Sequence, residues 1–119
     1  MDSSVDSMRD EAQRNAAADA IRELAAHIHA AGARLATMVD EFVEGGWWNS
    51  SGDWKSISHW LVLNCGLTRH EAITLARVAA ASPTMPQVME HARAGEVSLG
   101  VTALAAQVAT PEIETAGPV

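Results

Sequence analysis

Residues 17–42, AADAIRELAAHIHAAGARLATMVDEF, are the stretch that decides the fold. Their apolar positions are separated alternately by four and by three residues, which places them on one stripe of a helix. The stripe consists of Ala17, Ile21, Leu24, Ile28, Ala31, Leu35, Met38 and Phe42. The spacing predicts one continuous helix over 17–42. We expect it to begin between residues 8 and 16 and to end at Gly45-Gly46, where glycine removes helix preference.

The same stripe predicts how this helix packs. Ala25 and Val39 flank the stripe and make it wider than a two-position seam, which favours packing on other helices over an isolated coil. We therefore expect the large stripe residues to be buried against the later helices. These residues are Ile21, Leu24, Ile28, Leu35 and Phe42.

Composition sets the fold class of the whole chain. The 119 residues are 48% hydrophobic but only 4% aromatic, and alanine, a strong helix former, supplies much of the apolar content. This predicts an all-α domain over 1–110, with one long amphipathic helix and about four shorter ones, and a disordered tail over 111–119. The acidic N-terminus lacks the features of a leader, and no stretch is apolar enough to span a bilayer, so we expect a cytoplasmic protein without membrane contact.

Glycine and capping residues delimit the shorter helices. A second helix is predicted over about 56–65, with Gly66 as its stop. Thr68 and Glu71 have capping-box spacing and open a third helix, which ends at Ser82-Pro83. The residues expected to point inward from the third helix are Ala72, Leu75, Ala76 and Ala79.

Two further helices follow the same logic. Thr84 and Gln87 form a second capping-box pattern around Pro86, and Gly95 ends the fourth helix. Ser98 is the predicted cap of the fifth helix. Its apolar stripe is expected to be Val101, Leu104, Ala105 and Val108.

All four tryptophans fall within residues 47–60, around a loop rich in glycine and serine. In one interpretation Trp54 and Trp60 fill the core, and Trp47 or Trp48 covers the end of the long helix. In the other, Trp47 and Trp48 form an aromatic contact surface for a partner.

The chain carries little that points to catalysis. Its five histidines lack zinc-like spacing, and the single Cys65 excludes a disulfide framework and is expected to be inert packing at a helix end. Phosphate-binding loops, nucleophile elbows and paired carboxylates are absent from the sequence. We expect no catalytic residue, no cofactor, no metal site and no enzymatic activity.

Charge is distributed unevenly and bears on nucleic-acid binding. The net charge of −7 divides into −5 for residues 1–44, zero for 45–110 and −2 for the last nine. A DNA-binding domain normally carries a basic patch, because phosphate neutralisation supplies much of its affinity. Only the neutral middle segment leaves DNA binding open.

Residues 57–78 match a helix-turn-helix arrangement, with two helices joined by a tight turn at Gly66. If this motif contacts DNA, the groove-facing residues are Thr68, Arg69, His70, Thr74 and Arg77. A purely structural helical hairpin has the same apolar pattern, so both interpretations stay open.

The order of short motifs across residues 10–110 resembles the actinobacterial family called domain of unknown function 222 (DUF 222). The motifs are Trp60-Leu61, Cys65-Gly66-Leu67-Thr68, Glu71-Ala72, Ala76-Arg77-Val78-Ala79 and Gly95-Glu96-Val97-Ser98. Met85-Pro86 stands where the family tends to have Leu-Pro. The resemblance implies the N-terminal region of mycobacterial repeat-family proteins, which often continue into an HNH endonuclease. This chain has no His-Asn-His set, so nuclease activity is not implied for it.

Two hypotheses about function follow. The first is a non-catalytic helical module that binds DNA or positions a nuclease on it. The second is a protein-interaction or oligomerisation module built on the long helix, which pairs with a second copy or with another helical protein, or is a truncated repeat remnant without a function of its own.

Overall fold

The computed structural model describes residues 3–108 and is all-α there, as predicted, with no strand in that range. The predicted tail over 111–119 and the side chain of Trp47 lie outside the described part. The helices are α1 (Ser3–Gly45), α2 (Ile57–Cys65), α3 (Arg69–Ala81), α4 (Pro86–Arg93) and α5 (Leu99–Val108), with short 3-10 turns η1 (Trp47–Asn49) and η2 (Ser82–Thr84).

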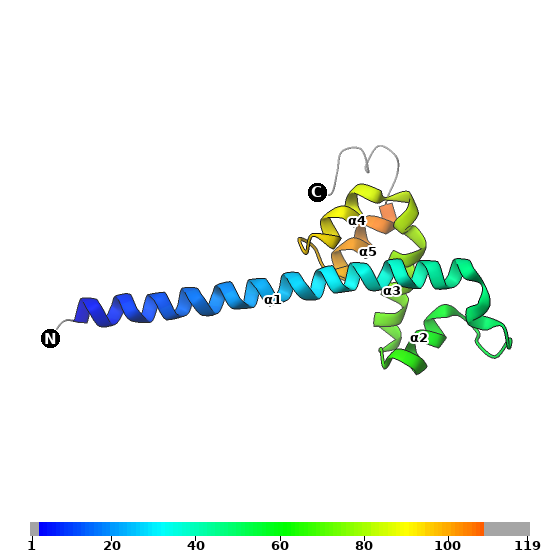
Figure 1. The fold of residues 1–119 in the computed structure, drawn as a ribbon, viewed down its shortest axis with the longest axis horizontal. Coiled ribbons are helices and arrows are strands. Elements are labelled where there is room, and N and C mark those ends of the chain that lie inside the picture. The colour runs from blue at the N-terminus through cyan, green and yellow to red at the C-terminus, as the bar shows by residue number, and fades with distance from the viewer. Residues whose placement is uncertain (1–2, 109–119) are drawn as a thin grey trace.

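The long helix α1 dominates the shape of the molecule. It begins at Ser3, earlier than the predicted range, and runs for 43 residues to Gly45, where Gly46 follows with a φ of 78°. Its C-terminal part packs against the other helices, while its N-terminal half extends away from them (Figure 1). The molecule measures 73 × 36 × 19 Å, and its radius of gyration is 19.3 Å, against about 13 Å for a compact chain of this length.

The predicted burial of the large α1 residues is wrong. Of the five expected inside, only Phe42 is half-buried. Ile21, Leu24 and Ile28 are 61–70% exposed, and Leu35 is 38% exposed. Met38 extends the exposed row and is 61% exposed. We call the five exposed residues, Ile21, Leu24, Ile28, Leu35 and Met38, the α1 stripe.

A different face of α1 packs on the rest of the molecule, and it is made of small residues. Ala33, Ala36 and Val39 are the buried residues of this helix. Small side chains let neighbouring backbones approach closely. A Cβ on Gly32 would lie 3.1 Å from Leu99 Cγ, so this glycine makes room for the first residue of α5. The spacing pattern identified the helix correctly but selected its large-residue face instead of its packing face.

The core lies between α1, α3, α4 and α5, with α2 covering one end of α3. Its largest fully buried side chains are Leu61, Leu75, Met85, Met89 and Val78. On α3 the predicted Ala72, Leu75 and Ala79 are buried, whereas Ala76 is only half-buried. We call residues 56–108, which hold α2 to α5, the head.

The caps of α2 and α3 follow the prediction. The Ser56 hydroxyl accepts a hydrogen bond from His59 N–H at 3.1 Å, and Gly66 ends α2 with a left-handed φ of 69°. Thr68 and Glu71 form the complete capping box of α3. The resulting tight turn holds α2 against α3.

The predicted second capping box is wrong. Met85, not Thr84, caps α4, and it makes no side-chain cap hydrogen bond. Thr84 instead lies in η2, and its hydroxyl donates to Ala81 O at 2.7 Å. Pro86 does occupy the first turn of α4, where a missing N–H costs nothing.

The predicted stripe of α5 is also wrong, although Ser98 does cap the helix by accepting from Val101 N–H at 3.1 Å. Val101, Leu104 and Val108 are all exposed, and Ala105 is half-buried. The buried residues are Thr102 and Ala103. The Thr102 hydroxyl donates to Ser98 O at 2.8 Å, which satisfies its buried polar group within the helix.

The interpretation in which Trp54 and Trp60 fill the core holds for Trp60 but not for Trp54. Trp60 packs on Phe42 with ring centroids 4.8 Å apart and joins the core cluster, as expected. Trp54 is half-buried and lies outside the core cluster; its ring packs in an edge-type contact with that of His59, with centroids 5.4 Å apart. Trp48 is half-buried in η1, which contacts α1. Cys65 is exposed, so its expected role as inert packing is wrong.

Candidate functional site

The five residues predicted to contact DNA all lie on α3 or at its cap, but they do not share one face. His70, Thr74 and Arg77 are spaced by four and three residues and lie on the same side of the helix. Arg69 is turned toward α2 and lines a cavity there. Thr68, Arg69, His70 and Arg77 are exposed, and Thr74 is half-buried. His70, Thr74 and Arg77 therefore form one side of α3, and Arg69 lies off that side.

The side chains of Thr68 and Glu71 cap the start of α3. The Thr68 hydroxyl accepts from Glu71 N–H at 3.1 Å, and a Glu71 carboxylate oxygen accepts from Thr68 N–H at 2.8 Å. The pKa of Glu71 lies below its usual range, mainly because of the hydrogen bond from the Thr68 backbone. The side chain of Thr68 is the second cause, and nearby His70 lowers the pKa further. Glu71 therefore keeps a negative charge at the end of α3 that would face DNA.

This capping box makes the stability of α3 depend on pH. Because the folded pKa of Glu71 is lowered, its contribution is complete above the unfolded value and disappears as pH falls through the folded pKa. We expect wild type to be more stable than Glu71→Gln at pH 7, and the difference to vanish as the carboxylate is protonated. Thermal melts of both proteins from pH 7 to about pH 2.5 measure this difference. An undiminished gap at the acid end contradicts the assignment.

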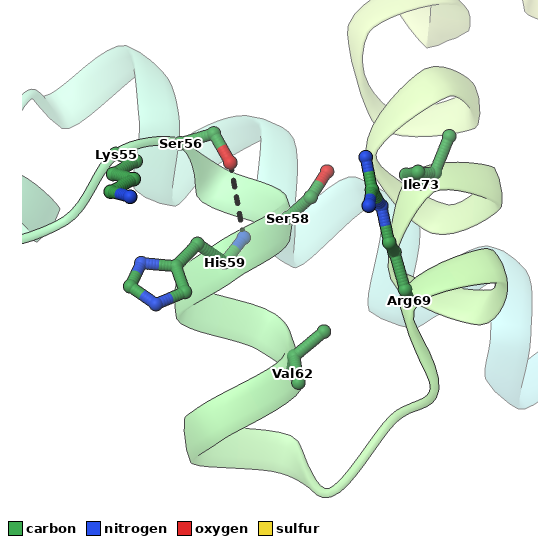
Figure 2. A pocket seen from close by; sticks show the side chains of 7 residues that line it. All are labelled: Lys55, Ser56, Ser58, His59, Val62, Arg69 and Ile73. Atoms are coloured by element: carbon green, nitrogen blue, oxygen red, sulfur yellow. Dashed lines mark hydrogen bonds between the residues drawn. The ribbon is translucent and has the colours of Figure 1, made fainter.

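A cavity of about 550 Å³ opens between α2 and α3. It is lined by Lys55, Ser56, Ser58, His59, Val62, Arg69 and Ile73. Figure 2 shows the hydroxyl of Ser58 and the side chain of Arg69 on the side of α2 that faces α3, while Lys55 and His59 lie on its other side. The lining residues include no acid, so the cavity favours anions, but its basic groups do not converge on one point.

His59 completes the wall of this cavity. Its Nδ1 is buried and has no hydrogen-bond partner among the described residues. His59 was not among the binding residues predicted from the sequence, where its only signal is its position one turn after the Ser56 cap. The imidazole packs beside Trp54, which gives it a structural contact on the outer side of α2.

Metal binding finds no support in the described part of the chain. Within residues 3–108, no group of three or more histidine, cysteine, aspartate or glutamate side chains is placed to hold a metal ion. None of the helices there is long and apolar enough to cross a bilayer.

The α1 stripe is a long exposed apolar surface. Residues 21–38 span about 26 Å of helix at 1.5 Å per residue, and large apolar side chains recur along that length. Further toward the N-terminus, residues 3–17 are exposed throughout. A helix in a folded protein gains most of its stability from packing an apolar face, and this half of α1 lacks such contacts within one chain.

Residues beside the stripe are uncharged or basic over most of its length. On one edge lie Ala20, His27 and Arg34, and on the other lie Ala18, Ala25 and Gly32. The acids Asp19 and Glu23 lie on the outer side of the helix, where Asp19 pairs with Arg22 at 2.8 Å. Between residues 18 and 34 the acids therefore point away from the stripe.

Comparisons with known proteins gave no match: no family model, no curated protein and no solved structure is significantly similar to this chain. The resemblance to the DUF 222 family rests on the short sequence motifs alone.

Proposed function

We propose that this chain is a non-catalytic oligomerisation module, in which the α1 stripe pairs with the same stripe of a second copy. The observation that carries the proposal is the exposure of Ile21, Leu24 and Ile28 on a helix that packs on the head through a different face. Large exposed apolar patches on soluble proteins mark interaction sites. The alternating spacing of four and three over three heptads is the pattern of a coiled-coil seam.

Two further observations favour a second copy as the occupant. The edges of the stripe carry no acid between residues 18 and 34, so two copies of this acidic chain can meet there without repulsion. A coiled coil also supplies the packing that the outer half of α1 lacks within one chain.

Self-association should therefore depend on the stripe. We expect wild type to be mainly dimeric at about 100 μM, and Ile28→Asp to raise the dimer Kd by at least ~100-fold, since each copy would place an unpaired charge in the seam. Sedimentation equilibrium over a range of concentrations measures both. Ile28 is 61% exposed, so the folded monomer should tolerate the change.

Ala16→Asp is the matched control. Ala16 is exposed on the same helix but lies off the stripe, so the same new charge should leave the dimer Kd within a few-fold of wild type. A wild-type protein that stays monomeric at about 100 μM, or equal weakening by both variants, would refute the proposal.

Duplex DNA is a second candidate, for the hairpin of α2 and α3. It is favoured by the exposed side of α3 with His70 and Arg77, and by the acid-free cavity that Arg69 lines. Arginine in these positions can meet phosphates or guanine edges. Glu71 opposes this candidate, because its charge lies at the same end of α3.

We expect binding to duplex DNA at ~50 mM salt to weaken as salt rises. The log-log slope should fall by about 0.9 for each arginine–phosphate interaction that Arg69→Ala or Arg77→Ala removes. Arg93→Ala, on α4, is the control and should leave the affinity unchanged. Fluorescence anisotropy measures the titrations. An absence of binding near 100 μM protein removes this candidate.

A further inference from the structure

We infer that the two copies pair in parallel and in register, so that both heads lie at the same end of the coil. This inference rests on the proposed function, because it specifies how the α1 stripe is used. Three features support it: the residues of the seam, the closure of its C-terminal end, and the registers that remain for an antiparallel pair.

The residue types of the seam favour the parallel arrangement. In heptad terms Ile21 and Ile28 occupy a positions and Leu24 occupies the d position between them. Isoleucine at a with leucine at d is the combination that favours parallel two-stranded coiled coils. In this arrangement every seam residue meets its own copy, so the small Ala17 and Ala31 each pair with the same alanine and the helices stay close at these layers.

The C-terminal end of the seam is closed by the head. Phe42 continues the spacing of the stripe, but Trp60 of α2 packs on it with ring centroids 4.8 Å apart. Toward the N-terminus the helix is free of the head (Figure 1). A partner helix can therefore follow the stripe outward from Met38 but cannot continue past Phe42 without meeting α2.

This closure excludes the antiparallel register that matches the large side chains best. Pairing Leu24 with Leu35 of a second copy, and Ile21 with its Met38, places residue 17 of that copy beside Phe42. Its residues 3–16 would then have to run across α2. In the parallel arrangement the same residues run beside their own copies, away from both heads. The seam positions Asp10 and Arg14 then each face a like charge, but they lie N-terminal to the apolar layers that begin at Ala17.

Shifting the antiparallel copy outward by two heptads keeps its residues 3–16 away from α2. The large side chains of the two copies then no longer face one another. In that register Leu35 faces Asp10 of the second copy, and Ala31 faces its Arg14. A buried charge without a partner is costly, and the leucine no longer meets an apolar side chain. Only the parallel arrangement both keeps large residues together and leaves α2 undisturbed.

Disulfide trapping tests the orientation. In a Cys65→Ser background, which removes the only native thiol, Ala17→Cys and Met38→Cys are made separately and oxidised with copper phenanthroline, which takes two electrons from two thiols to form one disulfide. A disulfide requires Cα atoms within about 7 Å. Parallel pairing brings both positions next to their own copies, whereas the antiparallel register described first separates them by about 25 Å or more along the axis.

We expect both variants to be linked into covalent dimers, at least ~10-fold faster than the control Ala16→Cys, an exposed neighbour of Ala17 that lies off the seam. Sedimentation equilibrium of the reduced proteins is run alongside. A dimer in which neither position links to itself, but Ile21→Cys of one copy links to Met38→Cys of another, overturns the parallel arrangement and leaves the proposed function standing. A monomer at about 100 μM overturns both.

Discussion

Gly95→Ala should destabilise the protein by about 2–5 kcal/mol, an unusually large effect for the addition of one methyl group. The Cβ would lie 2.6 Å from the backbone oxygen of Ala26 on α1, so the turn after α4 would have to move away from α1. Gly95 also has a φ of 83°, a left-handed conformation that costs an L-residue roughly 1–2 kcal/mol.

The hydrogen bonds around Gly95 explain why this conformation cannot relax freely. Glu96 N–H donates to His91 O at 3.1 Å, and Gly95 N–H donates to Ala92 O at 3.0 Å. These two bonds form the Schellman motif that closes α4. A change of φ at Gly95 would break them.

Gly66→Ala separates the cost of the left-handed φ from the cost of the close contact with α1. Gly66 has a similar φ of 69°, but nothing lies within 4 Å of the position that a Cβ would occupy, so the variant should show the conformational cost of about 1–2 kcal/mol alone. Urea unfolding followed by circular dichroism gives both free energies of unfolding. Equal losses for the two variants would mean that the turn does not touch α1 as described.

Leu75→Ala should cost about 2–5 kcal/mol, because it removes a fully buried side chain from the centre of the head. Leu75 is 1% exposed on α3, among the core residues that join this helix to its neighbours. The cavity left behind cannot be filled by solvent without exposing apolar atoms.

Leu24→Ala is the matched control for the same substitution. Leu24 is 61% exposed, so its loss should change the free energy of unfolding by less than about 0.5 kcal/mol at concentrations where the chain is monomeric. Urea unfolding at low micromolar protein compares the two variants. A larger loss for Leu24→Ala than for Leu75→Ala would place the α1 stripe inside the fold, where its spacing in the sequence predicts it.

Local signals predicted the secondary structure well. The spacing within 17–42 identified α1, and Gly66 with the Thr68 and Glu71 box located the turn between α2 and α3. These predictions succeeded because backbone conformation and capping depend on residues within a few positions of each other. The prediction failed at Thr84 because residues 82–84 form η2, and α4 begins one residue later than expected, with Met85 as its cap.

The candidate site was predicted only in part. His70, Thr74 and Arg77 share a face, as their spacing on one helix requires, but the direction of Arg69 depends on where α2 lies. The cavity between α2 and α3 combines side chains from both helices, so periodicity within either one could not reveal it.

The sequence by itself determined that the chain is helical, where its turns fall, and that α1 carries a long row of large apolar residues. Only the tertiary structure decided which face of α1 meets the head. Helices that pack closely need small residues at the contact, so Ala33, Ala36 and Gly32 took that place, although large residues stand out in a hydrophobic pattern. The large residues remain exposed as the α1 stripe.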